Sequence, residues 1–446
     1  MTGRYKAYPD YKESGIDWLY DIPAHWKTIP VGRCYHRVKR TGFESEELLS
    51  VYRDHGVIPK SSRDDNNNKA SDDLSPYQLV CENNLVMNKM KAWQGSIAIS
   101  EYRGIVSPAY FVYEPFKHTE SIVYPKYVHY LLRHPIYITQ YMSRSKGIRV
   151  NQWDLDPESF QSIELLLPLK EEQQKIINFL DHETTKIDIL IDKQEQLIEL
   201  LKEKRQAVIS HAVTKGLSPD AKMKDSGVEW LGEVPEHWKG TALKYITNIY
   251  GRIGFRGYTT NDIVEEGNGA ITMSPSNISN GVVSFDKATY ISWEKYYESP
   301  EIQLQKDDVV LVKTGSTLGK AGYIDKLICP TTLNPQLAVF KESSCCNKWL
   351  YYFLNTTLAK AYVNNSNSGG TVPTMSQEKI LSYIAPTPPL KEQGEIAAYL
   401  DLEISKIDDL ITKMNTMVDL INERKTALIS AAVTGRIDVR DWQESA

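Results

Sequence analysis

Apolar side chains recur at heptad spacing in two long stretches of the chain, 172–214 and 392–434. In each stretch one series of positions repeats every seven residues, and a second series lies between them at four-then-three spacing. This period predicts an α-helix that buries one stripe against a second helix. The expected seam positions are Leu180, Ile187, Ile191, Ile198 and Leu201 in the first stretch and Leu400, Ile404, Ile407, Ile411, Val418 and Ile421 in the second.

The same stretches show the signals of helix ends. Pro168 and Pro389 precede them, and Glu172 and Glu392 place negative charge near the positive end of each helix dipole. Because neither contains Gly or Pro after its first turn, each helix should run about 40 residues, roughly 60 Å at 1.5 Å per residue. We expect the two helices to pair as an antiparallel coiled coil with a globular lobe at each end and pseudo-twofold symmetry. The alternative, that each helix packs only on its own lobe, stays open.

Two separate segments of the chain occur twice. Ser14–Lys27 returns as Ser226–Lys239 with eight of fourteen positions identical. Glu172–Thr214 returns as Glu392–Thr434 at an offset of 220, with 20 identities in 43 positions and no gap. The order is therefore short motif, variable region and long repeat, followed by the same order again, and such self-similarity predicts a duplicated architecture.

The variable regions, about 28–167 and 240–387, alternate short apolar runs with turn residues. Leu85–Met87 and Tyr110–Tyr113 read as strands because Asn or Pro lies beside these runs, and Val309–Val312 is the corresponding apolar run of the second region. Tyr127–Leu132 and Lys348–Phe353 read as short helices. We therefore expect two mixed α/β lobes, which with the long helices give an α+β fold class.

Composition places the chain among soluble globular proteins of more than one domain. It has 446 residues, of which 41% are hydrophobic and 24% are charged. No apolar run approaches the roughly 18–20 residues that a membrane helix needs, and the five cysteines form no C-x-x-C pair, so we expect a cytoplasmic protein with no membrane partner. The net charge of −5 lacks the basic excess typical of a stand-alone nucleic-acid binder.

No motif in the sequence assembles a catalytic site. Gly315–Lys320 imitates a P-loop, but it has three residues between its glycines where the motif needs four. His25 and His237 each lack a second metal ligand nearby, so packing or capping roles are expected for them. We expect neither a catalytic residue nor a metal site in this chain.

The layout as a whole resembles the specificity subunit of type I restriction-modification systems, over essentially the entire chain. The resemblance rests on Trp18-Leu19, Ile22-Pro23 and His25-Trp26 with their copy, on Leu167-Pro168-Leu169-Lys170-Glu171 and Pro388-Pro389-Leu390-Lys391-Glu392 before the helices, and on Ala212-Val213-Thr214 and Ala432-Val433-Thr434 at their ends. Inside the variable regions, Asn88–Gly95 and Lys306–Lys320 look like two versions of the family's target-recognition domain. The family usually has Gly-Asp where this chain has Asn83-Asn84 and Asp307-Asp308, a departure that concerns a turn.

The resemblance implies a division of labour. Residues 1–167 and 216–387 would be target-recognition domains that each read half of a bipartite, asymmetric site in double-stranded DNA, and residues 168–215 and 388–446 would be the helical spacers. Two methyltransferase (modification) subunits and two ATP-dependent restriction subunits would dock on this scaffold. These partners, not this chain, would bind S-adenosylmethionine, ATP and Mg. Such a reader can borrow phosphate affinity from its partners, which fits the absence of a strong basic excess.

Polar and basic loops supply the candidate DNA contacts, because Arg and Lys suit guanine or phosphate, Asn and Gln suit adenine, and small residues let backbone amides approach phosphate. In the first lobe the candidates are Lys89, Lys91, Trp93, Arg144, Lys146, Arg149, Asn151 and Gln152. In the second they are Lys313, Thr314, Ser316, Lys320, Ser368, Gly369, Gly370 and Thr371.

Two other functions stay open at the level of sequence. One is a coiled-coil scaffold that joins two protein-binding lobes and makes no direct contact with DNA. The other is a two-lobed nuclease whose site is not recognisable, which magnesium-dependent cleavage by the isolated chain would reveal.

Overall fold

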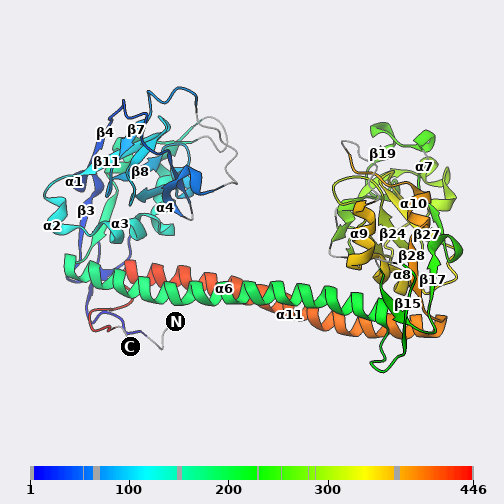
Figure 1. Ribbon diagram of the computed structural model, residues 1–446. Helices are drawn as coiled ribbons and strands as arrows, with labels where there is room; N and C mark the ends of the chain where they lie inside the picture. The colour runs from blue at the N-terminus through cyan, green and yellow to red at the C-terminus, as the bar shows by residue number, and fades with distance from the viewer. Residues whose placement is uncertain are drawn as a thin grey trace. The chain divides into compact units, whose positions relative to one another are not determined.

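The computed structural model describes residues 5–53, 55–63, 71–147, 153–228, 231–252, 254–279, 281–286, 288–365 and 372–443. The chain divides into two units (Figure 1): unit 1 comprises residues 1–194 and 417–446, and unit 2 comprises residues 195–416. Each unit contains one mixed α/β lobe and part of each of two long helices. The predicted α+β class, with two long helices and mixed lobes, is confirmed.

The long helices are α6 (Lys170–Lys215, 46 residues) and α11 (Leu390–Val433, 44 residues), slightly longer than the sequence predicts. Glu171 and Glu172 lie in the first turn of α6, and Glu392 lies in the first turn of α11. No described helix is long and apolar enough to cross a membrane.

In unit 1 the beginning of α6 packs along the end of α11. Leu180 and Ile187 of α6 share a hydrophobic cluster with Leu428 and Val433 of α11. Lys425 Nζ also lies 2.5 Å from Asp188 Oδ1. Because early residues of one helix meet late residues of the other, the pairing in unit 1 is antiparallel.

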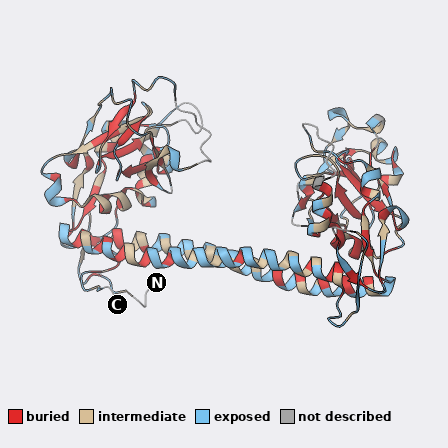
Figure 2. Cartoon of the chain, in the orientation of Figure 1, coloured by how far each residue is buried: buried red, intermediate tan, exposed pale blue. Residues whose placement is uncertain are grey.

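In unit 2 the end of α6 packs along the beginning of α11 in the same sense. Ile209 and Val213 share a second cluster with Leu400 and Ile404. Arg205 pairs with Asp408, with Nε 2.8 Å from Oδ1. Of the seam positions, Leu180, Ile187, Ile198, Leu400, Ile404 and Ile407 are buried, and Ile191, Leu201, Ile411, Val418 and Ile421 are half-buried. Figure 2 shows buried and half-buried residues interspersed with exposed ones along both long helices.

The first lobe, residues 27–167, is built on a four-stranded antiparallel sheet in the order β4-β11-β8-β9. Its strands are β4 (Tyr35–Val38), β8 (Leu85–Asn88), β9 (Ile97–Ile99) and β11 (Tyr110–Pro115). Smaller pairs are β5 (Leu49–Tyr52) with β6 (Gly56–Pro59), and β7 (Gln78–Val80) with β10 (Gly104–Val106). Two helices, α3 (Pro125–Leu132) and α4 (Pro135–Arg144), complete the core of the lobe.

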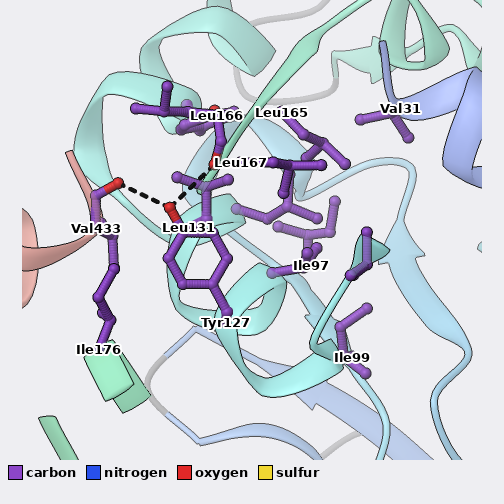
Figure 3. Packing of buried hydrophobic residues seen from close by; sticks show 14 of the residues in the cluster. Val31, Ile97, Ile99, Tyr127, Leu131, Leu165, Leu166, Leu167, Ile176 and Val433 are labelled. Atoms are coloured by element: carbon purple, nitrogen blue, oxygen red, sulfur yellow. Dashed lines mark hydrogen bonds between the residues drawn. The ribbon is translucent and has the colours of Figure 1, made fainter. Parts of the chain in front are cut away.

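The core of this lobe continues into the long helices. Tyr127 of α3 is fully buried, and its hydroxyl lies within hydrogen-bond distance of the carbonyl oxygens of Leu166 (3.0 Å) and Val433 (3.2 Å). Figure 3 shows this tyrosine among Leu131, Leu165 and Ile176. The helices of unit 1 therefore share the main hydrophobic cluster of the lobe, and a second cluster, which includes Val80 and Val112, lies within the lobe itself.

The second lobe, residues 239–387, repeats the sheet order despite the low similarity of sequence. Its four-stranded sheet is β18-β27-β24-β25, and a second sheet is β19-β23-β20-β26, in which β20 and β26 are parallel. The first sheet comprises β18 (Asn248–Tyr250), β24 (Val309–Val312), β25 (Ala321–Tyr323) and β27 (Leu337–Lys341). The second comprises β19 (Ile263–Val264), β20 (Gly269–Met273), β23 (Thr289–Ser292) and β26 (Thr331–Leu333). Its helices are α8 (Asn347–Leu354), α9 (Thr357–Asn365) and α10 (Gln377–Leu381).

The first and last strands of each lobe pair with each other. β3 (Lys27–Pro30) pairs antiparallel with β14 (Glu164–Leu167), and β17 (Lys239–Ala242) pairs antiparallel with β28 (Ile384–Thr387). This pairing brings the entry and exit of each lobe to the same place, next to the start of a long helix.

The repeated Trp motif joins lobe and helix. In unit 1 the Glu172 carboxylate accepts hydrogen bonds from Tyr8 Oη (2.7 Å) and Trp26 Nε1 (3.0 Å), and His25 Nε2 lies 2.8 Å from its second oxygen. Burial, followed by the bond to Glu172, raises the pKa of Tyr8. The acidic residue near the start of the long repeat is thus a partner of the short repeat.

The same junction occurs in unit 2. Glu392 accepts a hydrogen bond from Trp238 Nε1 (3.1 Å) and lies 2.8 Å from His237 Nε2. Gly216 has a positive φ of 79°, and a Cβ at this position would lie 3.2 Å from Cζ2 of the Trp238 ring. Gly435 in unit 1 has a φ of 73°, and a Cβ there would lie 3.3 Å from Cη2 of the Trp26 ring. These contacts explain why both segments are duplicated together.

Candidate nucleic-acid interface

The second lobe presents a glycine-containing loop between two buried strands. The chain leaves β24 at Val312, turns through residues 313–320 and re-enters the sheet as β25. Gly315 (φ 111°) and Gly319 (φ 82°) adopt left-handed backbone conformations that favour glycine. A Cβ on Gly319 would lie 2.9 Å from Cγ1 of Val363 in α9. The glycines therefore allow this loop to turn tightly and to pack closely against α9.

Backbone hydrogen bonds attach the loop to the segment before α10. The amide of Gly315 donates to the carbonyl oxygen of Pro373, and the amide of Met375 donates to the carbonyl oxygen of Lys313, both at 2.9 Å. The loop is therefore fixed at two points, while its middle faces solvent. Among the predicted contact residues Ser316 is exposed, and Lys313, Thr314 and Lys320 are half-buried.

Lys313 has an unusual environment for a lysine. Its burial lowers its pKa, and no carboxylate in the described part of the chain pairs with it. Its Nζ lies 3.3 Å from the position that a Cβ on Gly251 would occupy. A partly desolvated cation without a counter-ion suits a hydrogen-bond acceptor from outside the chain, such as a base edge or a phosphate oxygen.

Two glutamine amides border the same loop. Gln336 is oriented by Asn334, whose Oδ1 accepts a hydrogen bond from the backbone N–H of Gln336 (2.9 Å) and whose Nδ2 donates to the side-chain Oε1 of Gln336 (3.2 Å). Gln377 Nε2 lies 2.9 Å from the Cβ position of Gly251. Sequence reasoning missed Gln336 and Gln377 as site residues. The segment Leu333–Gln336 resembles part of the family's target-recognition pattern, but only folding brings its glutamine and Gln377 to this loop.

In the first lobe the corresponding loop lies between β8 and β9. It contains the short helix η2 (Ala92–Gln94), which packs against α4 and against β13 (Asp154–Leu155). The strand β12 (Ser145–Lys146) follows α4 directly and pairs antiparallel with β13. The structure therefore brings two predicted segments, around Lys91 and around Lys146, to one region of the lobe.

The predicted residues in this region have different surroundings. The Trp93 ring lies 5.0 Å from the Trp153 ring at 61°, and its Nε1 donates to the carbonyl oxygen of Met90. Trp93 is consequently half-buried and serves at least to pack this loop. Arg144 is half-buried and donates to Gln140 Oε1 at 2.7 Å. Lys91 and Lys146 are exposed, and Lys89 is half-buried.

Seven of the predicted contact residues lie outside the described residues. They are Arg149, Asn151, Gln152, Ser368, Gly369, Gly370 and Thr371.

Metal ligands do not gather anywhere in the part of the chain that the structure describes: no group of three or more His, Cys, Asp or Glu side chains could hold a metal ion there. What the loops offer is hydrogen-bond donors, amides and cations beside small residues. That chemistry suits binding of a polyanion.

Comparison with known proteins agrees with this geometry. Residues 235–418 match the family model described as the type I restriction modification DNA specificity domain. The type I restriction enzyme MjaVIII specificity subunit of Methanocaldococcus jannaschii is 23% identical over 443 residues, which are 97% of this chain and 98% of that protein. The StySPI specificity subunit of Salmonella potsdam is 20% identical over 447 residues, covering 95% of this chain and 91% of that one.

Solved structures show the same fold. A chain from a structural study of complex assembly and conformational transition of the type I R-M system superposes with a TM-score of 0.68 at 14% identity, over 94% of this chain and 100% of that one. The HsdS subunit from Thermoanaerobacter tengcongensis gives a TM-score of 0.51 at 15% identity, over 94% and 99% of the two chains.

Proposed function

We propose that the chain is a member of the type I restriction-modification DNA specificity family, whose model matches residues 235–418, and that each of its lobes reads one half of a bipartite, asymmetric DNA sequence. The observation that supports this most directly is the duplication. Both lobes have the same order of strands around the central sheet, yet the loops between equivalent strands contain different side chains. Two lobes that share a fold but differ in their loop side chains would recognise two different half-sites.

The proposed contacts of the second lobe are centred on the loop 313–320. Lys313 suits guanine O6 and N7 or a phosphate, and the Gln336 and Gln377 amides suit adenine. Thr314 and Ser316 can contact either a base or the backbone. Ser368, Gly369, Gly370 and Thr371 stay proposed DNA contacts on the grounds of their residue types alone.

The first lobe uses an equivalent surface of different composition. Lys89, Lys91 and Lys146 supply cations, and Arg144 supplies a guanidinium near the end of α4. Trp93 contributes through its packing on Trp153. Arg149, Asn151 and Gln152 complete the proposed contacts of this half.

The long helices have the partner-binding role in this proposal. Together they set the interval between the half-sites and dock two modification and two restriction subunits, which supply the sites for S-adenosylmethionine, ATP and Mg. Large exposed apolar side chains on these helices support a docking role, because contiguous apolar patches on a protein surface often mark interaction sites. Those exposed among the described residues are Ile189, Leu190, Leu197, Leu200, Leu390, Tyr399, Leu402, Leu410, Met417 and Leu420.

Exchange of one lobe tests the proposal directly. Residues 240–387 are replaced by the equivalent lobe of a relative with a different specificity, and modified positions are mapped across the genome of a host that expresses the partner subunits. We expect one half of the recognised sequence to change while the other half and the interval stay the same. The reason is that the first and last strands of each lobe pair with each other, which makes each lobe a separate domain. A change in both halves at once contradicts separate reading by the two lobes.

A further inference from the structure

A basic cleft lies between the end of α6 and the second lobe. It has a volume of about 620 Å³, and its walls include Lys202 and Arg205 from α6, Lys320 from the loop 313–320, and Lys360 from α9. Asp408 is the acidic residue among those that line it. Four cations and one carboxylate thus line the cleft, and Lys202 also pairs with Glu199 on its own helix, with Nζ 2.7 Å from Oε1.

The charges of this cleft are only partly neutralised from within. Arg205 engages Asp408 through Nε (2.8 Å) and Nη2 (3.3 Å). Among the described residues neither Lys320 nor Lys360 has a carboxylate partner, and the Lys360 ammonium donates only a long hydrogen bond, 3.4 Å, to Gln206 Oε1. The cleft therefore keeps unpaired positive charge.

The surroundings of Lys360 disfavour the charged form of its side chain. Burial lowers its pKa, and the positive charge of Arg205 lowers it further. Like charges held together in a partly buried site are stabilised when an anion enters it. The cleft is thus suited to a negatively charged ligand.

The cleft is continuous with the proposed reading surface. Thr317 and Lys320 line it, and both belong to the loop whose other members, Thr314 and Ser316, are proposed to face the bases. Four residues of chain span at most about 14 Å, so Ser316 and Lys320 can reach a base and a nearby phosphate of the same duplex.

A similar cleft of about 730 Å³ occurs in unit 1, where its lining includes Arg53, Lys126 and Lys425. Lys425 follows Arg205 by the repeat offset of 220, and it pairs with Asp188, which precedes Asp408 by the same offset. The helix contribution to the cleft is therefore duplicated. Its lobe contribution comes from unrelated positions and is mixed in charge: Glu101 lines it beside Arg53 and Lys126, and Lys126 pairs with Asp181 (2.8 Å).

We propose that the basic cleft, made by Lys202, Arg205, Lys320 and Lys360, binds the phosphodiester backbone that flanks the half-site read by the second lobe. The long helix is then a DNA-contacting element as well as a spacer. This inference rests on the proposed function and deepens it, because it assigns sequence-independent positioning to residues outside the reading loop.

The test uses the specificity subunit purified with its modification subunits and DNA that contains its mapped recognition sequence. The double variant Lys202→Gln, Lys360→Gln leaves the reading loop intact. Binding is measured over a range of salt concentrations. We expect the slope of log affinity against log salt to become shallower by roughly 0.9 for each phosphate that the variant no longer neutralises, about 1.8 in total. Affinity for cognate and unrelated DNA should fall by the same factor, and the modified sequence should not change.

A matched control removes the same charge elsewhere on unit 2. Lys391→Gln, Lys406→Gln also deletes two lysines, each paired with a glutamate on its own helix as Lys202 is with Glu199, and neither lines the cleft. Its salt slope should equal that of the wild type. Lys360→Arg, which keeps the charge, should preserve the wild-type slope, and equal melting temperatures show that the variants are folded.

Two results would overturn the inference. One is an unchanged salt slope in the double variant, and the other is a loss confined to particular base pairs, which would make these lysines readers. If instead the wild-type complex prefers no DNA sequence, the proposed function itself fails, and that result is distinguishable because it does not depend on the variants.

Discussion

His134 is held in one protonation state by its position at the start of α4. Its Nδ1 accepts a hydrogen bond from the amide of Ile136 (3.1 Å), so the ring proton is on Nε2, which lies 2.6 Å from Oγ of Ser430. Burial lowers its pKa to about 4. His129 in the preceding helix also has a pKa of about 4, through burial and then the positive charge of Arg133. Both rings are therefore neutral in the folded protein at pH 7.

This protonation state predicts how stability changes with pH. Unfolding returns the pKa of His134 from about 4 to its ordinary value near 6.5, so the unfolded chain binds more protons between these values, and stability falls as the pH drops through that range. The loss from this residue approaches roughly 3 kcal/mol below pH 4. Denaturant unfolding at several pH values measures it. His134→Asn keeps a capping acceptor without titrating, so its free energy of unfolding should depend less on pH, and equal slopes would contradict the assignment.

Turn residues show what could and could not be predicted from single positions. Asn83 and Asp307, where the related family usually has glycine, adopt positive φ angles of 65° and 70° two residues before the starts of β8 and β24. Asn and Asp tolerate this region better than other non-glycine residues. The family pattern therefore located the turns correctly, and the substitution preserved their geometry.

At the level of elements, the long helices depend on their buried seam rather than on their exposed apolar residues. Ile187 is 7% exposed and lies in the core of unit 1, whereas Leu190, three residues later, is 51% exposed. Ile187→Ala should lower the free energy of unfolding by about 2–4 kcal/mol, because it removes a packed side chain and leaves a cavity. Leu190→Ala in the isolated chain should stay within about 0.5 kcal/mol of the wild type. Chemical denaturation of the two variants compares them, and equal losses would mean that the seam is misassigned.

The elements were predictable where one local period decides the structure. The heptads gave both long helices within a few residues of their ends, and the apolar run Val309–Val312 coincides with β24. The parallel pairing of β20 with β26 was not predictable, because it joins strands about 60 residues apart and depends on the whole second lobe.

The candidate site was predictable only in part, for the same reason. Basic residues in glycine-containing loops marked Lys313 and its neighbours. The partners Gly251, Gln336 and Gln377 reach that lysine only through folding, and the basic cleft draws Lys202 from a helix that the heptad pattern alone presents as a spacer. A site whose residues come from distant segments of the chain cannot be identified from any one stretch of the sequence.

At the scale of the molecule, unit 1 is assembled from both ends of the chain. The amide of Asp438 donates to the carbonyl oxygen of Lys6 (2.8 Å), and Tyr11 Oη donates to the carbonyl oxygen of Gly435 (2.9 Å). The Trp442 ring lies 5.6 Å from Phe179, and Ile437 and Val439 are buried. The C-terminal residues after Gly435 therefore have the role in unit 1 that the residues directly after Gly216 have in unit 2.

Removal of residues 436–446 should weaken unit 1 selectively. Loss of two buried aliphatic side chains alone costs about 3–6 kcal/mol. Hydrogen exchange measured by mass spectrometry should show faster exchange in residues 5–26 and 170–194, with residues 195–416 as the internal reference. Faster exchange of equal size in both units would contradict this division of the chain.

A ribosome completes unit 2 before unit 1, because residues 195–416 are contiguous while unit 1 needs residues 417–446. At about 5–20 residues per second, translation of the intervening ~220 residues takes roughly 11–44 s. During that interval the nascent first lobe lacks Leu428 and Val433, so Tyr127 and Ile187 have no cover from α11. A message that ends prematurely within α11 would release a chain with this apolar surface still open, a form that cellular proteases and chaperones can distinguish from the finished protein.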